Sequence, residues 1–186
     1  MNAHQQATGS AYFIDTKKQE VETHTLAVIA ENQPGVLARI IGLFAGRGYN
    51  IDSLTVSETE HEKHVSRFTI VTTGTASVIA QIKAQLDRMV PVHSVADLTA
   101  DGNFLARDLA MVKVKGEGDK RIEALRLGDA FRARVVDASV ESFVFELTGK
   151  PDKIDQFISL MMPLGLVEVS RTGVAAIARG GEVLKA

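Results

Sequence analysis

Hydrophobic residues recur along this chain at two spacings, one typical of strands and one of helices. An apolar run at residues 25–30 predicts a short strand. At residues 34–46 the apolar positions return every three or four residues, which is the spacing of an amphipathic helix. Gly46 and Gly48 are expected to end that helix.

The segments that follow complete a first structural unit. Residues 50–58 and 64–73 predict two strands that pair as a hairpin across a charged turn at residues 59–63. Helical spacing returns at residues 75–89, and residues 91–98 predict a closing strand. The order β-α-β-β-α-β within about 75 residues is that of the ferredoxin-like unit.

The same order repeats beyond the boundary expected at residues 101–103. The expected elements are a strand at 109–115, a helix at 119–127 capped by Asp119, strands at 133–138 and 142–148, a helix at 151–162, and a last strand from 166–169 with 174–177. The fold class is therefore expected to be α+β, with two ferredoxin-like βαββαβ domains. They would span residues 23–100 and 101–186, after a flexible extension at residues 1–22.

Strand edges left free in such units favour self-association. Small domains bury a small share of their surface, and bare sheet edges are hazards for uncontrolled association. Pairing edge to edge into a homodimer would solve both problems. It would also bring two copies of the loop at residues 32–35 to one interface, with Asn50 at the start of the adjacent strand. Association through the second unit is equally compatible with the sequence.

Composition narrows the class of protein. The chain has 186 residues, 45% of them hydrophobic, and a net charge of −2. It therefore has no basic field for nucleic acid, and no run of about 20 apolar residues that could span a membrane. Cysteine is absent, which excludes disulfides, thiol catalysis and thiolate metal ligands. Residues 1–10 lack the pattern of a signal peptide, so a cytoplasmic protein is expected.

The loop that precedes the first helix is the best candidate binding site. Pro34 is expected at the first helical position, where its missing N–H costs nothing. The N–H groups of Gly35, Val36 and Leu37 would then be free to receive an anion such as a small carboxylate, and the amide of Asn32 would orient it. The alternative is an ordinary strand-to-helix turn with no ligand.

Other motifs have simpler explanations. Residues 61–64 contain two histidines, but the spacing is one residue short of a zinc-binding helix motif, so a solvated turn is the alternative. Residues 116–121 resemble a phosphate loop only loosely and fit a strand-to-helix turn. Gly42 and Gly46 suggest close packing of their helix on the sheet. No nucleophile–base pair emerges, so the chain is expected to bind and not to catalyse, without a metal site.

Three motifs resemble those of a known family. Residues 31–37, 47–54 and 170–173 read ENQPGVL, RGYNIDSL and SRTG, and further matches occur at 66–70 and 111–114. The first motif alone indicates an ACT domain, a module that senses amino acids. Together they resemble the regulatory (small) subunit of acetolactate synthase, over about residues 24–181.

That resemblance implies a non-catalytic subunit and places the chemistry on another chain. The family's small subunit binds and activates a large catalytic subunit, which uses thiamine diphosphate, magnesium and FAD. That enzyme condenses two pyruvates, or pyruvate and 2-oxobutanoate, on the route to valine, leucine and isoleucine. The resemblance also implies feedback inhibition by an effector, usually valine, bound between two ACT domains. No cofactor is expected on this chain.

The resemblance also implies which residues hold the effector. Asn32 and Gly35 match the effector loop, and Asn50 matches the position that approaches from the neighbouring protomer. Ile51 is an apolar neighbour for a branched side chain. The expected effector-binding residues are Asn32, Pro34, Gly35, Val36, Leu37, Asn50 and Ile51.

Two other readings have different requirements. A stand-alone ACT-domain regulator of another enzyme or of transcription would need, for nucleic acid, a basic face or aromatic side chains on the strands, and the chain offers Phe68 and little else. An enzyme in its own right would need a catalytic cluster, and the sequence shows none.

Overall fold

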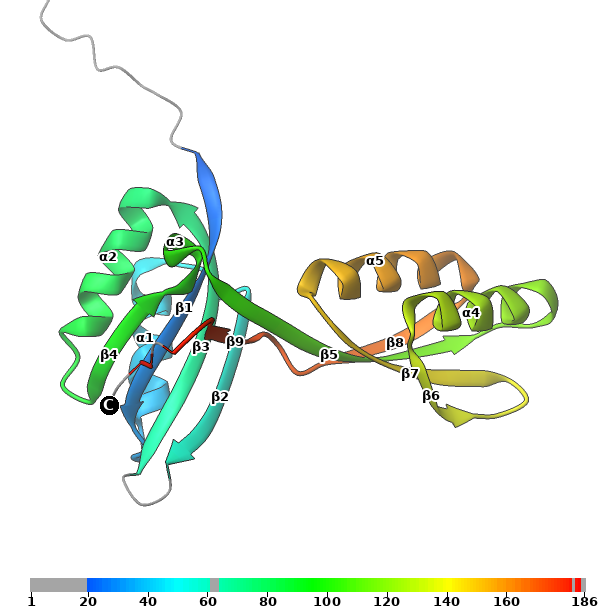
Figure 1. The fold of residues 1–186 in the computed structure, drawn as a ribbon, viewed down its shortest axis with the longest axis horizontal. Coiled ribbons are helices and arrows are strands. Elements are labelled where there is room, and N and C mark those ends of the chain that lie inside the picture. The colour runs from blue at the N-terminus through cyan, green and yellow to red at the C-terminus, as the bar shows by residue number, and fades with distance from the viewer. Residues whose placement is uncertain (1–19, 61–63, 182, 185–186) are drawn as a thin grey trace, which may run out of the picture.

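The computed structural model describes residues 20–60, 64–181 and 183–184. Most of the expected extension and the last three residues of the expected turn, His61 to Lys63, lie outside these ranges. The described residues form two lobes, and one long strand, β5, runs from the first lobe into the second (Figure 1).

The first lobe is a four-stranded antiparallel sheet in the order β2-β3-β1-β4. Two helices cover one face of this sheet, and the apolar side chains between the helices and the strands form its main core. Its elements are β1 (Val21–Glu31), α1 (Val36–Arg47), β2 (Ser53–Glu60), β3 (Val65–Thr75), α2 (Ala76–Asp87) and β4 (Val92–Asp97).

The second lobe repeats this arrangement with the strand order β6-β7-β5-β8. A short helix, α3 (Leu98–Asp101), precedes it. Its elements are β5 (Phe104–Lys115), α4 (Gly118–Phe131), β6 (Arg134–Ala138), β7 (Ser142–Gly149), α5 (Pro151–Met161), the 3-10 turn η1 (Met162–Leu164) and β8 (Leu166–Arg171). The predicted fold class, α+β with two ferredoxin-like units, is confirmed.

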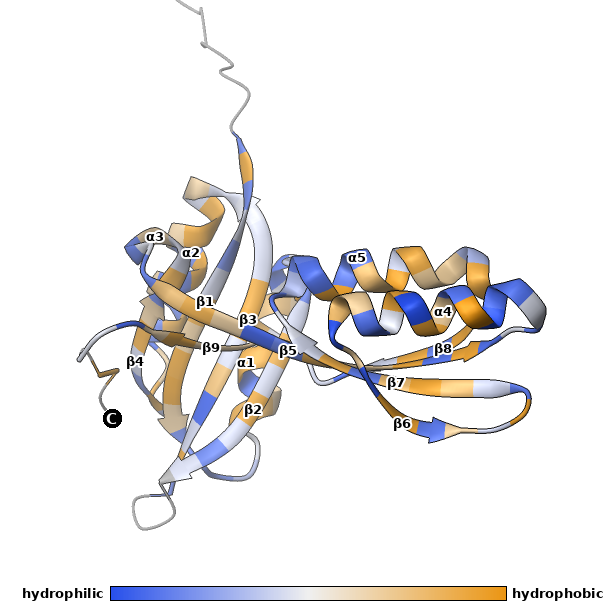
Figure 2. Ribbon diagram, turned by 45° about the vertical axis from the view of Figure 1, so that its right-hand side comes forward, coloured by the Kyte–Doolittle hydropathy of each residue, from blue (hydrophilic) through white to orange (hydrophobic). Residues whose placement is uncertain are grey.

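The last strand, β9 (Ala175–Ala178), differs from the prediction. Residues 166–169 and 174–177 were expected to form one last strand, and both segments do pair with β5, but they form two separate strands, of which β8 pairs with residues 110–114. Strand β9 instead pairs with the first residues of β5 and lies across β1 and β3 of the first lobe (Figures 1 and 2). There Val174 and Ala176 pack with Ala27 and Leu98 in a third apolar cluster.

A glycine allows the chain to cross from β8 to β9. Gly173 has a φ of +84°, and a Cβ on it would lie 2.9 Å from the hydroxyl oxygens of both Ser53 and Thr55. Only glycine fits this conformation and this close approach to β2. The periodicity of the strands does not contain this information, because it does not say where the chain leaves one stretch of β5 and joins another.

Several element boundaries also differ from the prediction. Helix α1 begins at Val36, so Pro34 is not at its first position; Gly35 caps it in a left-handed conformation that ends any helical path through the preceding residue. Strand β2 begins at Ser53, which leaves Asn50 in a loop. The cap of α4 is Glu117, without a side-chain bond, and not Asp119.

Candidate functional site

The loop between β1 and α1 is held at both of its ends by backbone hydrogen bonds. At the end of β1, the N–H of Glu31 donates to the Pro91 carbonyl at 2.9 Å, and the N–H of Asn32 donates to the His64 carbonyl at 2.6 Å. At the start of α1, the N–H of Val36 donates to Gln33 at 3.3 Å. The loop is therefore a fixed turn built on the sheet.

The first turn of α1 presents unpaired backbone donors. Among the described residues, the N–H groups of Gly35, Leu37 and Ala38 have no hydrogen-bond partner, whereas that of Val36 is turned back to Gln33. No acidic side chain lies in this turn. A helix N-terminus with free N–H groups favours an anion through both hydrogen bonds and the helix dipole. The turn can accept a carboxylate.

The side chains of the loop divide into two groups. Val36 is buried in the first core, so only its backbone faces the loop. Asn32 is exposed and its amide has no partner among the described residues, so it is free to bond a ligand. Leu37 is 41% exposed and offers apolar surface beside the free N–H groups. Loop and helix together therefore present a polar and an apolar contact side by side.

Asn50 and Ile51 lie at the other end of the lobe. The Asn50 carbonyl accepts from Thr72 Oγ1 at 2.6 Å, and Thr72 pairs with His24 near the start of β1. The loop at residues 32–35 instead follows the end of β1. From Thr72 to Val65, which pairs with Glu31 at the end of β1, the seven steps along β3 span about 23 Å at 3.3 Å per residue. One chain therefore does not bring Asn50 together with the loop.

The environments of these two residues are defined. The Asn50 side-chain amide donates to Asp52 Oδ1 at 2.5 Å, which fixes its direction. Ile51 is half-buried and packs against the first core. Both residues precede β2, which is an edge strand because, among the described strands, it pairs with β3 alone.

An exposed apolar surface lies on the helix-covered side of that edge. Leu37 and Ile41 are 41% and 39% exposed on α1, and Val56 is 39% exposed on β2. Val56 points to the same sheet face as Leu54, which packs in the first core. Gly42 has open space around its α-carbon, so the expectation that it packs on the sheet is wrong. Leu37, Ile41 and Val56 are hereafter the α1–β2 surface.

The sequence of α1 contains a signal for this surface beyond the spacing of its core positions. Apolar and small residues continue on α1 beyond the three side chains that its core needs, which are Val36, Ile40 and Phe44. A stripe this wide on a short helix indicates a second contact. No group of three His, Cys, Asp or Glu residues that could hold a metal occurs within the described ranges. In the same ranges no helix has the length and apolarity needed to cross a bilayer.

Comparisons with known proteins agree on one family. Residues 26–94 match the family model described as the AHAS small subunit-like ACT domain, and residues 107–180 match the small subunit of acetolactate synthase. A relative from Archaeoglobus fulgidus, named as a probable acetolactate synthase small subunit, is 44% identical over 159 residues, covering 86% of this chain and 98% of the relative. The acetolactate synthase small subunit of Mycolicibacterium smegmatis is 40% identical over 85% of this chain and 92% of its own length.

A solved structure extends the similarity to the whole fold. The crystal structure of the acetolactate synthase small subunit from Thermotoga maritima is similar with a TM-score of 0.77 at 34% sequence identity. The match covers 87% of this chain and 99% of that one, so both lobes share the same architecture.

Proposed function

Because this chain belongs to the family of acetolactate synthase small subunits, we propose that it binds and activates the large catalytic subunit and makes it sensitive to a branched-chain amino acid, valine foremost. The family is a regulatory one, and catalysis lies on the large subunit. Thiamine diphosphate, magnesium and FAD would accordingly be held by that partner, with which this chain would act in the cytoplasm.

The observation that carries this proposal is the turn at the start of α1. An amino acid brings a carboxylate, an ammonium group and a side chain to its site. The free N–H groups of Gly35 and Leu37 suit the carboxylate, and the Asn32 side-chain oxygen can accept from the ammonium group. The exposed Leu37 side chain suits an aliphatic ligand.

A second copy of the chain would complete the site. Antiparallel pairing of two β2 edges about a twofold axis would place the start of one β2 beside the end of the other. Asn50 and Ile51 precede β2, and the Asn32 loop lies near its end through the Asn32–His64 bond. Each loop would then receive Asn50 and Ile51 from the other copy. The exposed α1–β2 surface supports this mode of pairing.

Such a site would discriminate modestly and regulate effectively. One methylene in an apolar pocket is worth about 1–3 kcal/mol, so valine, leucine and isoleucine would differ in affinity without absolute selection. Regulation requires only that the effector favour one state of the assembly. A coupling free energy of about 1–3 kcal/mol gives roughly a 5- to 150-fold effect.

Reconstitution with the catalytic subunit tests the proposal. The chain alone should form no acetolactate, its addition should raise the activity of the large subunit, and valine should reverse that increase. Leucine and isoleucine, titrated in parallel, would rank the effectors. Acetolactate formation by this chain alone, or no effect on the large subunit at any ratio, would contradict the proposal.

A further inference from the structure

The face of the first sheet opposite α1 and α2 carries a groove that the effector site does not use. It has a volume of about 400 Å³ and lies between β2 and β3 on one side and β5 and β9 on the other. Its polar lining comes from Thr55, Ser57, Arg67, Thr69 and Arg107. We call it the open-face groove.

Strand register makes four of these side chains neighbours. Thr55 pairs with Thr69 and Ser57 pairs with Arg67 across β2 and β3. Residues two apart on a strand share a face, so the four side chains form one polar patch. Its neighbours toward β1 are the apolar residues of the third cluster, such as Ala27 and Ala176. The patch is thus polar within an apolar setting.

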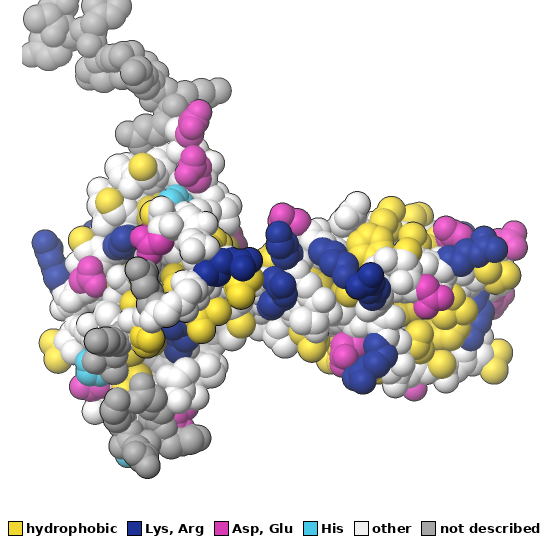
Figure 3. Space-filling view, viewed as in Figure 1, with side chains coloured by type: hydrophobic (Ala, Val, Ile, Leu, Met, Phe, Trp, Pro, Cys, Tyr) yellow, Lys and Arg dark blue, Asp and Glu magenta, His cyan; other side chains and the backbone are white. Residues whose placement is uncertain are grey.

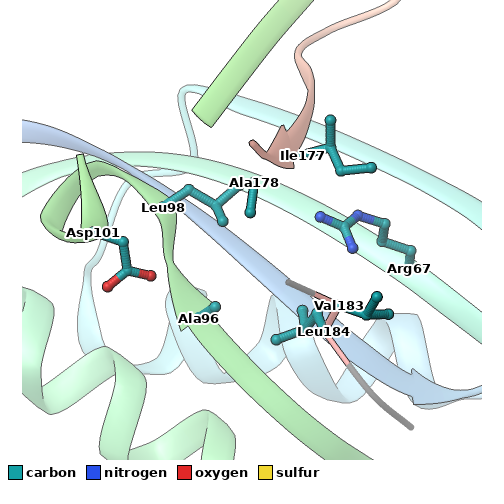
Figure 4. Close-up of a pocket in the computed structure, with 8 residues that line it drawn as sticks. All are labelled: Arg67, Ala96, Leu98, Asp101, Ile177, Ala178, Val183 and Leu184. Carbon is teal, nitrogen blue, oxygen red and sulfur yellow. The ribbon is translucent and has the colours of Figure 1, made fainter. Parts of the chain in front are cut away.

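Within the part of the chain that the structure describes, Arg67 is a cation without a counter-ion. Its guanidinium donates one hydrogen bond, at 2.9 Å, to the Ala176 carbonyl of β9. This bond uses one of the five N–H groups of the guanidinium. Burial lowers the pKa of Arg67, and no carboxylate among the described residues pairs with it. Figure 4 shows Asp101 across the adjoining cavity, with Leu98 and Ala178 between it and Arg67. A half-buried cation of this kind is stabilised by an anion.

The two threonine hydroxyls are also unpaired. Thr69 is 4% exposed, and its hydroxyl has no hydrogen-bond partner among the described residues. Thr55 Oγ1 is buried and likewise lacks a partner. Buried hydroxyls are normally bonded, so Thr55 Oγ1 indicates a group that the described residues do not supply, and the Thr69 hydroxyl lies on the strand position paired with it. Both can donate to a carboxylate oxygen.

Apolar and basic groups define the rest of the groove. Leu105 and Ile177 contribute apolar walls, and Ile177 is 59% exposed. Arg107 adds a second cation, with one guanidinium N–H bonded to the Ala106 carbonyl. Figure 3 shows Lys and Arg side chains gathered where the two lobes meet, which favours approach of an anion.

We propose that the open-face groove binds a carboxylate that carries a small apolar group. The planar guanidinium of Arg67 matches a carboxylate in two parallel hydrogen bonds, and the hydroxyls of Thr55 and Thr69 donate to its remaining lone pairs. The carboxylate belongs either to a free organic acid or to an Asp or Glu side chain of a partner protein. The site lies on the opposite sheet face from the effector loop, so it is separate from the proposed effector site.

Titration of the full chain with isovalerate, a branched acid without an amino group, tests the free-acid source by calorimetry. We expect saturable binding that Arg67→Met weakens at least tenfold, about 1.4 kcal/mol, and that Thr69→Val weakens roughly threefold. Arg88→Met removes an exposed cation at the end of α2 and should change nothing. Isovalerate is valine without its ammonium group and would also suit the loop at Gly35, so each titration is repeated in the Gly35→Asp background, where the binding that remains belongs to the open-face groove.

A second titration, with the catalytic subunit, tests the protein source. If isovalerate does not bind the free chain but Arg67→Met and Thr69→Val weaken association with the catalytic subunit, the carboxylate comes from that partner. Circular dichroism checks the fold of each variant. If Arg67→Met does not fold, the result for the near-isosteric Thr69→Val is used in its place. The proposal would be overturned if Thr69→Val and Thr55→Val, each shown to be folded, changed neither the binding of isovalerate nor the association with the catalytic subunit. Inhibition by valine is measured separately, because it tests the proposed function and not the open-face groove.

Discussion

Gly35 combines a conformational and a chemical requirement at one residue. Its φ of +87° is one that L-residues rarely adopt, and the space around its α-carbon is open. The conformation therefore requires glycine, while the open space leaves room for a ligand. The conformation of Gly35 and the open space beside it together leave the N–H groups at the start of α1 accessible to a ligand.

Gly35→Asp should abolish inhibition by valine while activation of the catalytic subunit is retained. A carboxylate at this position would repel the carboxylate of the ligand and fill its space. Gly35→Asn is the matched control, because Asn tolerates the left-handed conformation and is neutral. A valine titration of the reconstituted enzyme should show a much larger loss for Asp than for Asn. Equal inhibition curves for Gly35→Asp and the wild type would refute the assignment.

Asp108 is the second residue whose environment makes a clear prediction. Its carboxylate is buried where β5 leaves the first lobe, and it pairs with Arg171, which also donates to Asp155 at 2.6 Å. Burial alone would lower the pKa of Arg171, but its hydrogen bonds to Asp108 and Asp155 together raise it. The buried charge of Asp108 and the charge of the Arg171 guanidinium thus stabilise each other.

Asp108→Asn should lower the free energy of unfolding by about 2–3 kcal/mol. Breaking a buried ion pair costs about 3–5 kcal/mol, and the one-third exposure of Arg171 reduces that cost. Asp155→Asn, at the exposed member of the cluster, should cost less than about 1 kcal/mol. Urea unfolding of both variants makes the comparison, and a larger effect at Asp155 would contradict it.

Single residues of the two sites were predictable to different degrees. The Asn32 and Gly35 positions follow from a contiguous motif, so the sequence alone indicated them. Arg67 and Thr69 join Ser57 and Thr55 only through the pairing of β2 with β3. That register depends on which face each strand buries, so no local pattern gave this patch.

Among the elements, those with strong periodicity were predicted well and their ends less well. The apolar stripes gave α1, α2 and α5, and alternation gave the β2–β3 hairpin. The start of α1 was placed too early, because Pro34 suits a first helical turn and also suits the turn it occupies here. The break between β8 and β9, and the packing of β9 on the first lobe, were not predicted, since the four residues of β9 carry no sign of these contacts.

The buried residues next to and within β9 should stabilise its packing against the first lobe. Val174→Asp places a carboxylate at a position that is 6% exposed in the third cluster, which should cost about 3 kcal/mol and lower Tm by about 6–12 °C. Val140→Asp makes the same change at a position that is 92% exposed and should leave Tm nearly unchanged. Scanning calorimetry checks both, and equal shifts would show that β9 contributes no packing.

At the scale of the whole molecule, the arrangement of the lobes lies beyond sequence patterns. Two repeats of one topology were predictable, but their connection through the long β5 and the return of β9 to the first lobe were not. Both depend on contacts between residues far apart in the chain. The same holds for assembly, because Asn50 and the Asn32 loop lie at opposite ends of one lobe.

Ile41→Glu should weaken self-association at least a hundredfold. Ile41 is 39% exposed on the α1–β2 surface, and a charge buried there would lack a partner. Leu160→Glu is matched in exposure, also 39%, but lies on α5 of the second lobe. Sedimentation equilibrium of both variants measures the dissociation constants. Loss of the dimer in Leu160→Glu alone would assign association to the second lobe.

Complementation between two inactive variants tests the shared effector site most directly. Gly35→Asp disrupts the loop of its own chain, and Asn50→Ala removes the side chain that is proposed to contact the loop of the other copy. Neither variant should bind valine alone. Unfolded and refolded together, they should regain one valine site per mixed dimer, because one loop and the opposite Asn50 are both intact. Calorimetry that finds no valine binding in the verified mixed dimer would contradict a site built from two copies.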